Sequence, residues 1–186
     1  MHIGSNLKRE GASNIDFEQL ANGLKAVMTG LPTEVTAEEA NELLQKYFTE
    51  IEENKIKAVM EEGKSFLAAN SLRPEVTTLP SGLQYEVLVE GKGAKPKASD
   101  TVRCHYVGTL VDGTEFDSSV RRGEPATFPV GGVIAGWVEA LQLMAVGSKW
   151  KLFIPYNLGY GARGAGQDIP PYATLIFEVE LLDIVK

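Results

Sequence analysis

The stretch VRCHYVGTLVDGTEFDSS, residues 102–119, decides the fold class of the C-terminal half of this 186-residue chain. Val102, Cys104 and Tyr106 alternate with polar residues, which is the period of a β-strand with one buried face. The Asp-Gly pair at 112–113 is typical of a tight turn between two antiparallel strands. We therefore predict a hairpin here, with Cys104 as a small, inert hydrophobic residue that faces the core.

The same period of two recurs in the flanking segments 83–90 and 175–182, which predicts further antiparallel strands with one buried face. The only helix-like segment in this half is short, spans 136–143 and is followed by Gly147. An antiparallel sheet curled around one short helix accounts for this pattern. With the helical segment that precedes it, the fold class is α+β.

A change of composition divides the chain. Eight of the nine prolines lie at Pro74 or later, and fourteen of the nineteen glycines lie at Gly82 or later. We therefore predict two domains, a helical one at 1–73 and a β-rich one at 74–186.

The N-terminal segment follows the helical period. Apolar residues repeat at three and four between Phe17 and Met28, with Asp16 as the N-cap and Gly30 after the end. Thr36 and Glu39 have the spacing of a capping box, and the absence of proline beyond them predicts one long helix at about 37–70.

The apolar stripe of this long helix changes face near its middle. Residues from Ala40 to Ile51 cluster on one side, and residues from Ile56 to Leu67 cluster on another. The first stripe lacks a sufficient partner within the chain, so we expect a homodimer through residues upstream of about Ile51. A monomeric helical hairpin folded onto the second domain is the alternative.

The net charge, the length of the apolar runs and the numbers of cysteines and histidines argue against several classes of protein. A net charge of −7 with no basic stripe argues against nucleic-acid binding. The apolar runs are too short to cross a membrane, and no secretory leader follows Met1, so the chain is expected to be soluble and not membrane-bound. One cysteine and two isolated histidines provide no recognisable metal site, and no cofactor is expected.

Two further motifs follow the first in order: FPVGGVIAGWVEAL at 128–141 and LGYGARGAGQDIPPYATLIFEVELL at 158–182. Together the three motifs resemble the FKBP-type peptidyl-prolyl cis-trans isomerases over roughly 79–185. The resemblance implies an enzyme that accelerates rotation about X-Pro bonds during protein folding. Its partners would be proline-containing unfolded or nascent polypeptides, and also ligands of the tacrolimus and rapamycin type.

The resemblance also assigns the site. It implies a catalytic group made of Tyr106, Phe116, Asp117, Trp137, Tyr160 and Phe177. It implies a substrate-binding group made of Arg122, Phe128, Val133, Ile134 and Ile169. Trp137 would form the floor, Tyr106, Phe128 and Phe177 the walls, and Val133 and Ile134 the rim.

The resemblance gives the polar groups of the site specific roles as well. The Ile134 N–H and the Tyr160 hydroxyl would bind substrate carbonyls. Asp117 would pair with Arg122 and Tyr106, and Ile169 would lie on an overhanging loop.

Three rim positions depart from the pattern of the small single-domain relatives. Ala126, Ala165 and Asp168 stand where those relatives have an aromatic residue, a histidine and an isoleucine. These changes leave drug affinity and the preference for the residue before proline open.

The helical half resembles, by pattern and length, the bacterial two-domain subgroup related to the macrophage infectivity potentiators, whose N-terminal helices form a homodimer. In that subgroup the first helix begins several residues earlier. The location expected from the sequence is cytoplasmic, with the periplasm as the alternative if a leader has been trimmed.

The sequence disfavours two other functions and leaves a third as an alternative. GARGAG and EGKGAK lack the full spacing of a phosphate loop. A hydrolase built on Ser119, His105 and Asp117 is disfavoured because His105 would face away from Tyr106 and the pocket side. A dimeric chaperone clamp with weak or incidental isomerase activity is the alternative from another class.

Overall fold

The computed structural model describes residues 2–13 and 15–185. The helices are α1 (His2–Arg9), α2 (Phe17–Thr29), α3 (Ala37–Asn70), α4 (Ser119–Arg122) and α5 (Ala135–Leu143), with short 3-10 turns η1 (Val130–Gly132), η2 (Tyr156–Leu158) and η3 (Gly161–Arg163). The strands are β1 (Val76–Thr78), β2 (Gln84–Val89), β3 (Thr101–Leu110), β4 (Glu115–Ser118), β5 (Ala126–Pro129), β6 (Lys149–Ile154) and β7 (Leu175–Val185). Contacts divide the chain into two compact units, Met1–Lys57 and Ala58–Lys186, which are described separately.

The capping signals place the helices of the first unit as predicted. The Asp16 carboxylate accepts from the N–H groups of Glu18 and Gln19, and Gly30 closes α2 in the left-handed conformation. The capping box forms at the start of α3, where the Thr36 N–H donates to Glu39 at 2.9 Å and the Glu39 N–H donates to the Thr36 hydroxyl. α1 was not predicted.

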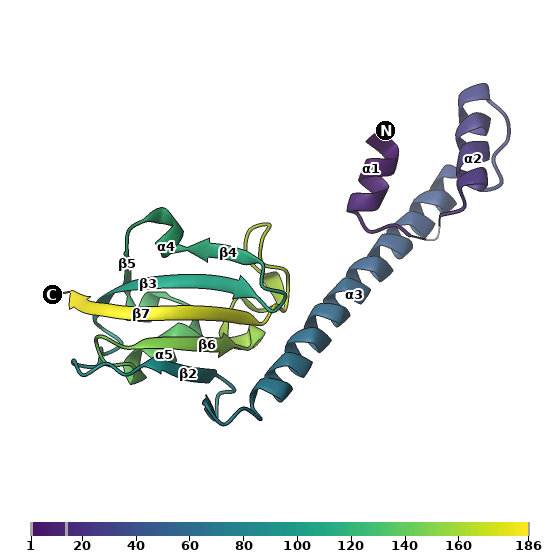
Figure 1. Ribbon diagram of the computed structural model, residues 1–186. Helices are drawn as coiled ribbons and strands as arrows, with labels where there is room; N and C mark the ends of the chain where they lie inside the picture. Colours follow the sequence, from purple (N-terminus) through teal and green to yellow (C-terminus); the bar gives the residue numbers. More distant parts are fainter. Residues whose placement is uncertain (1, 14, 186) are drawn as a thin grey trace. The chain divides into compact units, whose positions relative to one another are not determined.

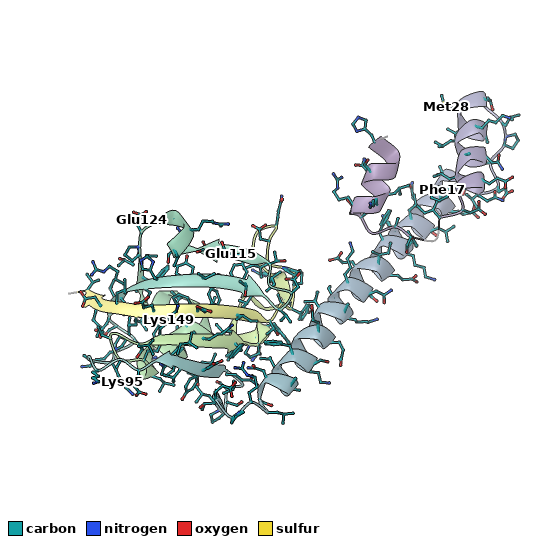
Figure 2. The ribbon with its side chains drawn as sticks, viewed as in Figure 1. Phe17, Met28, Lys95, Glu115, Glu124 and Lys149 are labelled. Atoms are coloured by element: carbon teal, nitrogen blue, oxygen red, sulfur yellow. The ribbon has the colours of Figure 1, made fainter. Side chains whose placement is uncertain are left out.

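Polar contacts hold the start of the chain on the first half of α3. The Tyr47 hydroxyl donates to the Ser13 carbonyl at 2.7 Å, and Lys55 Nζ donates to the Glu10 carbonyl at 3.0 Å. The apolar face of α2 is exposed by contrast: Figure 2 labels Phe17 and Met28 at its two ends, with 76% and 86% of their surface accessible.

The second unit is built on one antiparallel sheet in the order β1-β2-β6-β7-β3-β4, with β5 paired to β3 beside β4. Figure 1 shows β7 between β3 and β6. α5 packs on β6, since a Cβ at Gly136 would lie 2.7 Å from the Ile154 side chain. β7 has the predicted alternation, since Leu175, Phe177, Val179 and Leu181 are buried and their neighbours are not. The fold class is therefore α+β as predicted.

Two strand expectations need correction or addition. In β2 the expected buried face ends early, because Val87 and Val89 are 40% and 50% exposed and a bulge interrupts the pairing with β6. The hairpin at Asp112 forms, with the Thr114 N–H donating to its carboxylate at 2.9 Å. Between β4 and β5 the chain makes the unpredicted one-turn helix α4, capped by Ser118.

The last turns of α3 are part of the second unit. The Phe66 and Phe153 ring centroids are 5.9 Å apart. The Asn70 amide donates to Gln84 Oε1 at 2.8 Å, and the Gln84 amide donates to the Leu67 carbonyl at 2.9 Å. The second apolar stripe of the long helix therefore packs against the sheet. The domain boundary expected between residues 73 and 74 stays a prediction.

Candidate active site

A cavity of about 510 Å³ opens between α5, the sheet and the loop before β7. Ten of the residues assigned to the site line it: Tyr106, Phe116, Asp117, Phe128, Val133, Ile134, Trp137, Tyr160, Ile169 and Phe177. These residues come from four strands, one helix and two loops. The eleventh, Arg122, lies behind the wall and contacts Asp117 and Tyr106.

The floor of the cavity is Trp137 on α5, with 4% of its surface accessible. Three rings stand edge-on to the indole: the centroids of Phe177, Tyr106 and Phe128 lie 5.3, 5.4 and 5.7 Å away, at 80–86° to its plane. This arrangement is favourable for aromatic quadrupoles and holds the indole rigidly. Its Nε1 has no acceptor among residues 2–13 and 15–185.

Gly108 in β3 leaves room for the part of the cavity wall that Phe116 and Phe177 form. A Cβ at Gly108 would lie 2.6–2.7 Å from the rings of Phe116 and Phe177, so any larger residue would push them apart. The two rings instead meet edge to face, with centroids 5.4 Å apart.

The Asp117 carboxylate in the wall is paired with two neighbouring side chains. The Tyr106 hydroxyl donates to Asp117 Oδ2 at 2.5 Å, and Arg122 donates to both the Asp117 carboxylate and, at 2.8 Å, the Tyr106 hydroxyl. Burial acts to raise the pKa of Asp117, but these hydrogen bonds outweigh it and hold the pKa below its ordinary value. The carboxylate therefore stays ionised and cannot serve as a proton donor near neutral pH.

Both tyrosine hydroxyls of the cavity keep their protons. Burial, and secondarily the charge of Asp117, raises the pKa of Tyr160, which is 40% exposed at the mouth. Burial and the hydrogen bond to Asp117 raise the pKa of Tyr106. Within residues 2–13 and 15–185 no side chain or carbonyl accepts a hydrogen bond from the Tyr160 hydroxyl, which is thus a free donor at the cavity.

The N-terminus of α5 supplies a second donor. Ile134 is the N-cap of this helix and has no side-chain cap, and its N–H donates to no backbone acceptor within the described part of the chain. Unpaired N–H groups at a helix N-terminus attract carbonyl oxygens.

Four further residues line the cavity. Ala165 and Asp168, singled out from the sequence as rim departures, are among them, together with Gly132 and Gly166. Ala126 lies in β5 opposite Cys104 and is not among the lining residues. Sequence reasoning missed the two glycines, whose only signal was their place inside the Gly-rich motifs.

The hydrolase alternative fails for the predicted reason, because Tyr106 lines the cavity and His105 does not. The His105 ring does lie near Ser119, with Nδ1 3.1 Å from Oγ. However, Ser119 is fully buried, its Oγ accepts from the Tyr106 N–H at 2.7 Å, and Asp117 is paired elsewhere. No nucleophile is therefore presented to the cavity by this group.

No group of three or more His, Cys, Asp or Glu side chains within 2–13 and 15–185 is arranged to hold a metal ion. None of the helices there combines the length and hydropathy that crossing a membrane requires.

Known proteins match both halves of the chain. Residues 92–182 match the family described as FKBP-type peptidyl-prolyl cis-trans isomerase. Residues 1–87 match the domain described as amino terminal to FKBP-type peptidyl-prolyl isomerase.

Two curated proteins align over nearly the whole chain. The FKBP-type 22 kDa peptidyl-prolyl cis-trans isomerase of Escherichia coli (strain K12) is 45% identical over 189 residues, covering 100% of this chain and 91% of that protein. The outer membrane protein MIP of Legionella longbeachae is 43% identical over 196 residues, covering 99% and 82%. These names give no support to the cytoplasmic location expected from the sequence.

A solved structure agrees with the fold. The crystal structure of FkpA from Escherichia coli has a TM-score of 0.83 and 36% identity, covering 98% of this chain and 89% of that chain. The aromatic cavity, the family matches and a relative of 45% identity that is named as an isomerase lead to one conclusion: the chain belongs to the FKBP-type peptidyl-prolyl cis-trans isomerases and catalyses rotation about X-Pro peptide bonds.

Proposed function

We propose that the cavity around Trp137 is the catalytic site and that it acts by holding the twisted X-Pro bond in an apolar, water-poor enclosure. The observation that carries this proposal is the ring of three aromatic side chains that stand edge-on to the indole. A cavity of about 510 Å³ is of the size that takes a small ligand, so it can accept a proline with its neighbouring peptide groups.

The physical demand of the reaction is rotation about a partial double bond. Amide resonance sets a barrier of ~18–20 kcal/mol, and rotation breaks no covalent bond. In the twisted state the carbonyl is less polarised than in the planar amide, so it loses less on leaving water. An apolar site therefore favours the twisted state over the hydrated planar one.

Polar groups at the edge of the cavity orient the substrate. The Ile134 N–H binds a substrate carbonyl, and the Tyr160 hydroxyl donates to the carbonyl of the residue before proline. Asp117, fixed by Tyr106 and Arg122, keeps the wall in shape and presents an ionised oxygen near the rotating carbonyl.

A protease-free assay of cis-to-trans conversion in a proline tetrapeptide tests this assignment. Wild type should accelerate conversion at micromolar enzyme, and Trp137→Ala should lower kcat/KM at least about tenfold because water re-enters the floor. Equal activity of the variant, with an unchanged circular dichroism spectrum, would remove the cavity from the mechanism.

The proposal includes a homodimer through the first unit. Large apolar side chains of α2, of the link to α3 and of the first half of α3 are exposed: Phe17, Leu20, Leu24, Val27, Met28, Leu31, Val35, Leu43 and Leu44. Leaving so much apolar surface in water is unfavourable, and a second copy of the chain offers the same surface for a symmetric contact.

Sedimentation equilibrium at tens of micromolar tests the dimer. Wild type should sediment with twice the mass of the chain, while Leu43→Glu with Leu44→Glu should sediment as a monomer. A monomeric wild type would contradict the proposed dimer, because the exposed apolar side chains of the first unit would then not be buried by a second copy of the chain.

Client binding is the second function proposed, as a dimeric chaperone that holds unfolded proline-containing chains. The exposed apolar surface of the first unit favours it. Suppression of aggregation of a reduced, unfolded protein by Trp137→Ala would separate holding from isomerisation. If that variant fails to suppress aggregation where wild type succeeds, holding depends on the catalytic cavity.

Ligands of the tacrolimus and rapamycin type are proposed to occupy the same cavity. They should quench Trp137 fluorescence in Trp150→Phe, which leaves Trp137 as the only indole, and should inhibit the peptide assay competitively. Quenching without inhibition would place them elsewhere.

The proposed location is the periplasm. Fractionation of the native cells, with a cytoplasmic marker as control, should recover the protein in the periplasmic fraction. Recovery of the protein with the cytoplasmic marker would contradict the periplasmic location and support the cytoplasmic one.

A further inference from the structure

The wall of the cavity contains a second carboxylate, Asp168, on the loop between η3 and β7. The two carboxylates differ in their partners. Asp117 is hydrogen-bonded by Tyr106 and Arg122, whereas Asp168 has neither an ion pair nor a hydrogen-bond donor among residues 2–13 and 15–185. Asp168 is exposed, and no lysine, arginine or histidine lines the cavity with it. The mouth therefore carries one uncompensated negative charge.

The loop around Asp168 is held in place. The Ala165 N–H donates to the Ile169 carbonyl at 2.9 Å and the Ile169 N–H donates to the Ala165 carbonyl at 3.1 Å, so Asp168 lies inside a closed five-residue turn. Ile169 is 7% exposed and anchors the turn in the core. Two small residues of the same turn, Ala165 and Gly166, also line the cavity. Their small side chains take up little of the space that a long substrate side chain would need.

The position of this charge relative to the substrate follows from the proposed function, on which the inference rests. The rotating carbonyl belongs to the residue before proline, and Tyr160 donates to it. Tyr160 and Asp168 both lie on the connection between β6 and β7, and both line the same cavity. In the proposed binding mode, the residue before proline is therefore the one whose side chain lies on the side of this connection.

We propose that Asp168 makes this isomerase prefer a basic residue, lysine or arginine, directly before the proline. An extended cationic side chain crosses the small residues at the mouth and places its charge beside the carboxylate. The same carboxylate disfavours glutamate or aspartate at that position. The pair is exposed, so the discrimination is modest and sensitive to salt.

Four tetrapeptides that carry lysine, glutamine, glutamate or leucine before proline test the preference in a protease-free assay at low ionic strength. For wild type we expect kcat/KM for lysine to exceed that for glutamine by about two- to fivefold, and glutamate to fall below glutamine. In Asp168→Asn both ratios should approach one, and in Asp168→Lys the order of lysine and glutamate should reverse.

Two controls separate this effect from the acidity of the whole protein. Asp183→Asn removes the same unit charge from the exposed end of β7, outside the cavity, and should keep the wild-type ratios. In about 1 M salt, where the screening length is ~3 Å, the wild-type lysine-to-glutamine ratio should fall toward one.

The outcomes are distinguishable. If no peptide is isomerised, the proposed catalytic site fails. If the leucine peptide is turned over but the lysine-to-glutamine ratio is the same in wild type and Asp168→Asn, the site stands and Asp168 does not set specificity. A preference that appears only when lysine follows the proline would also overturn the inference.

Discussion

Gly63 of α3 packs directly against Thr174, the residue before β7, so closely that a methyl group at Gly63 would overlap the Thr174 hydroxyl. Both residues are buried. In an exposed helix, alanine would stabilise over glycine by about 0.5–1 kcal/mol. At Gly63 the cost of overpacking should exceed this gain in helix propensity, because Thr174 is a buried β-branched residue next to a strand and has little freedom to move.

We therefore expect Gly63→Ala to lower the free energy of unfolding by about 1–2 kcal/mol. Urea unfolding followed by tryptophan fluorescence is a clean measurement, since Trp137 and Trp150 both lie in the second unit. Adding Thr174→Ala should recover stability in a double-mutant cycle. A Gly63→Ala variant as stable as wild type would mean that the two elements do not pack this tightly.

The second prediction concerns the smallest stable isomerase fragment. The sequence predicts that 77–186 folds and isomerises short peptides nearly as well as the whole chain. The contacts of Phe66, Asn70 and Arg73 with the sheet indicate instead that 58–186 is the stable unit.

Removal of α3 uncovers Phe153, which packs against Phe66, and breaks the two hydrogen bonds of the Gln84 amide, each worth about 0.5–1.5 kcal/mol. We expect 58–186 to be at least ~2 kcal/mol more stable to urea than 77–186. Equal midpoints for the two fragments would show that α3 adds nothing to the sheet unit.

The third prediction ranks the groups of the cavity. Tyr160→Phe removes one hydrogen bond, worth about 0.5–1.5 kcal/mol, and should lower kcat/KM about two- to tenfold, less than Trp137→Ala. Trp150, which stacks on Tyr85 at 4.3 Å outside the cavity, provides the matched control. Trp150→Phe should keep kcat/KM within about twofold of wild type; a loss as large as that of Trp137→Ala would point to general disruption of the core.

The fourth prediction concerns pH. The pKa of Asp117 is below its ordinary value when folded, so the unfolded chain binds a proton first as pH falls. Its contribution to stability is complete above the ordinary aspartate range, near pH 4, and is lost as pH falls through the folded pKa. The difference in unfolding free energy between wild type and Asp117→Asn should therefore be constant from pH 5 to 8 and shrink below about pH 4. A difference that grows on acidification would reverse the sign assigned here.

The fifth prediction concerns Cys104, which is fully buried in β3 as the alternation predicted. Burial raises the pKa of the thiol from 9.0 to about 12. The folded chain keeps the proton where the unfolded chain loses it, so this group's contribution to stability is present below pH 9 and declines as pH rises toward 12.

At pH 8 a thiol reagent should label Cys104 in native protein only as fast as the domain opens, and immediately in urea. Between pH 9 and 11, Cys104→Ala should lose less stability with rising pH than wild type does. Rapid stoichiometric labelling of the native protein would contradict the burial.

Signals confined to a few neighbouring residues predicted most of the fold. The capping box at Thr36 and the lack of proline placed α3, and the alternation in 175–182 placed β7. α1 and α4 were missed because a short helix depends on tertiary contacts more than on its own sequence. The exposed end of β2 was also missed, because the pattern of a strand does not tell whether another layer covers it.

The order of three sequence motifs predicted the site residues. Periodicity alone would assign the same residues to the hydrophobic core. The roles of Gly132 and Gly166 depend on where two loops meet, and no local pattern encodes that. The contact of His105 with Ser119 was missed for a similar reason: alternation gives the side of a strand but not the neighbour on that side.

The junction of the two compact units falls at Lys57 and Ala58, inside the continuous helix α3. Domains are commonly joined by exposed flexible linkers, where proteases cut first. A protease needs an extended backbone, so cleavage at this junction requires several hydrogen-bonded turns to unwind. Proteolytic separation of the two units at this junction is therefore governed by the local unwinding equilibrium of α3 rather than by the accessibility of a loop.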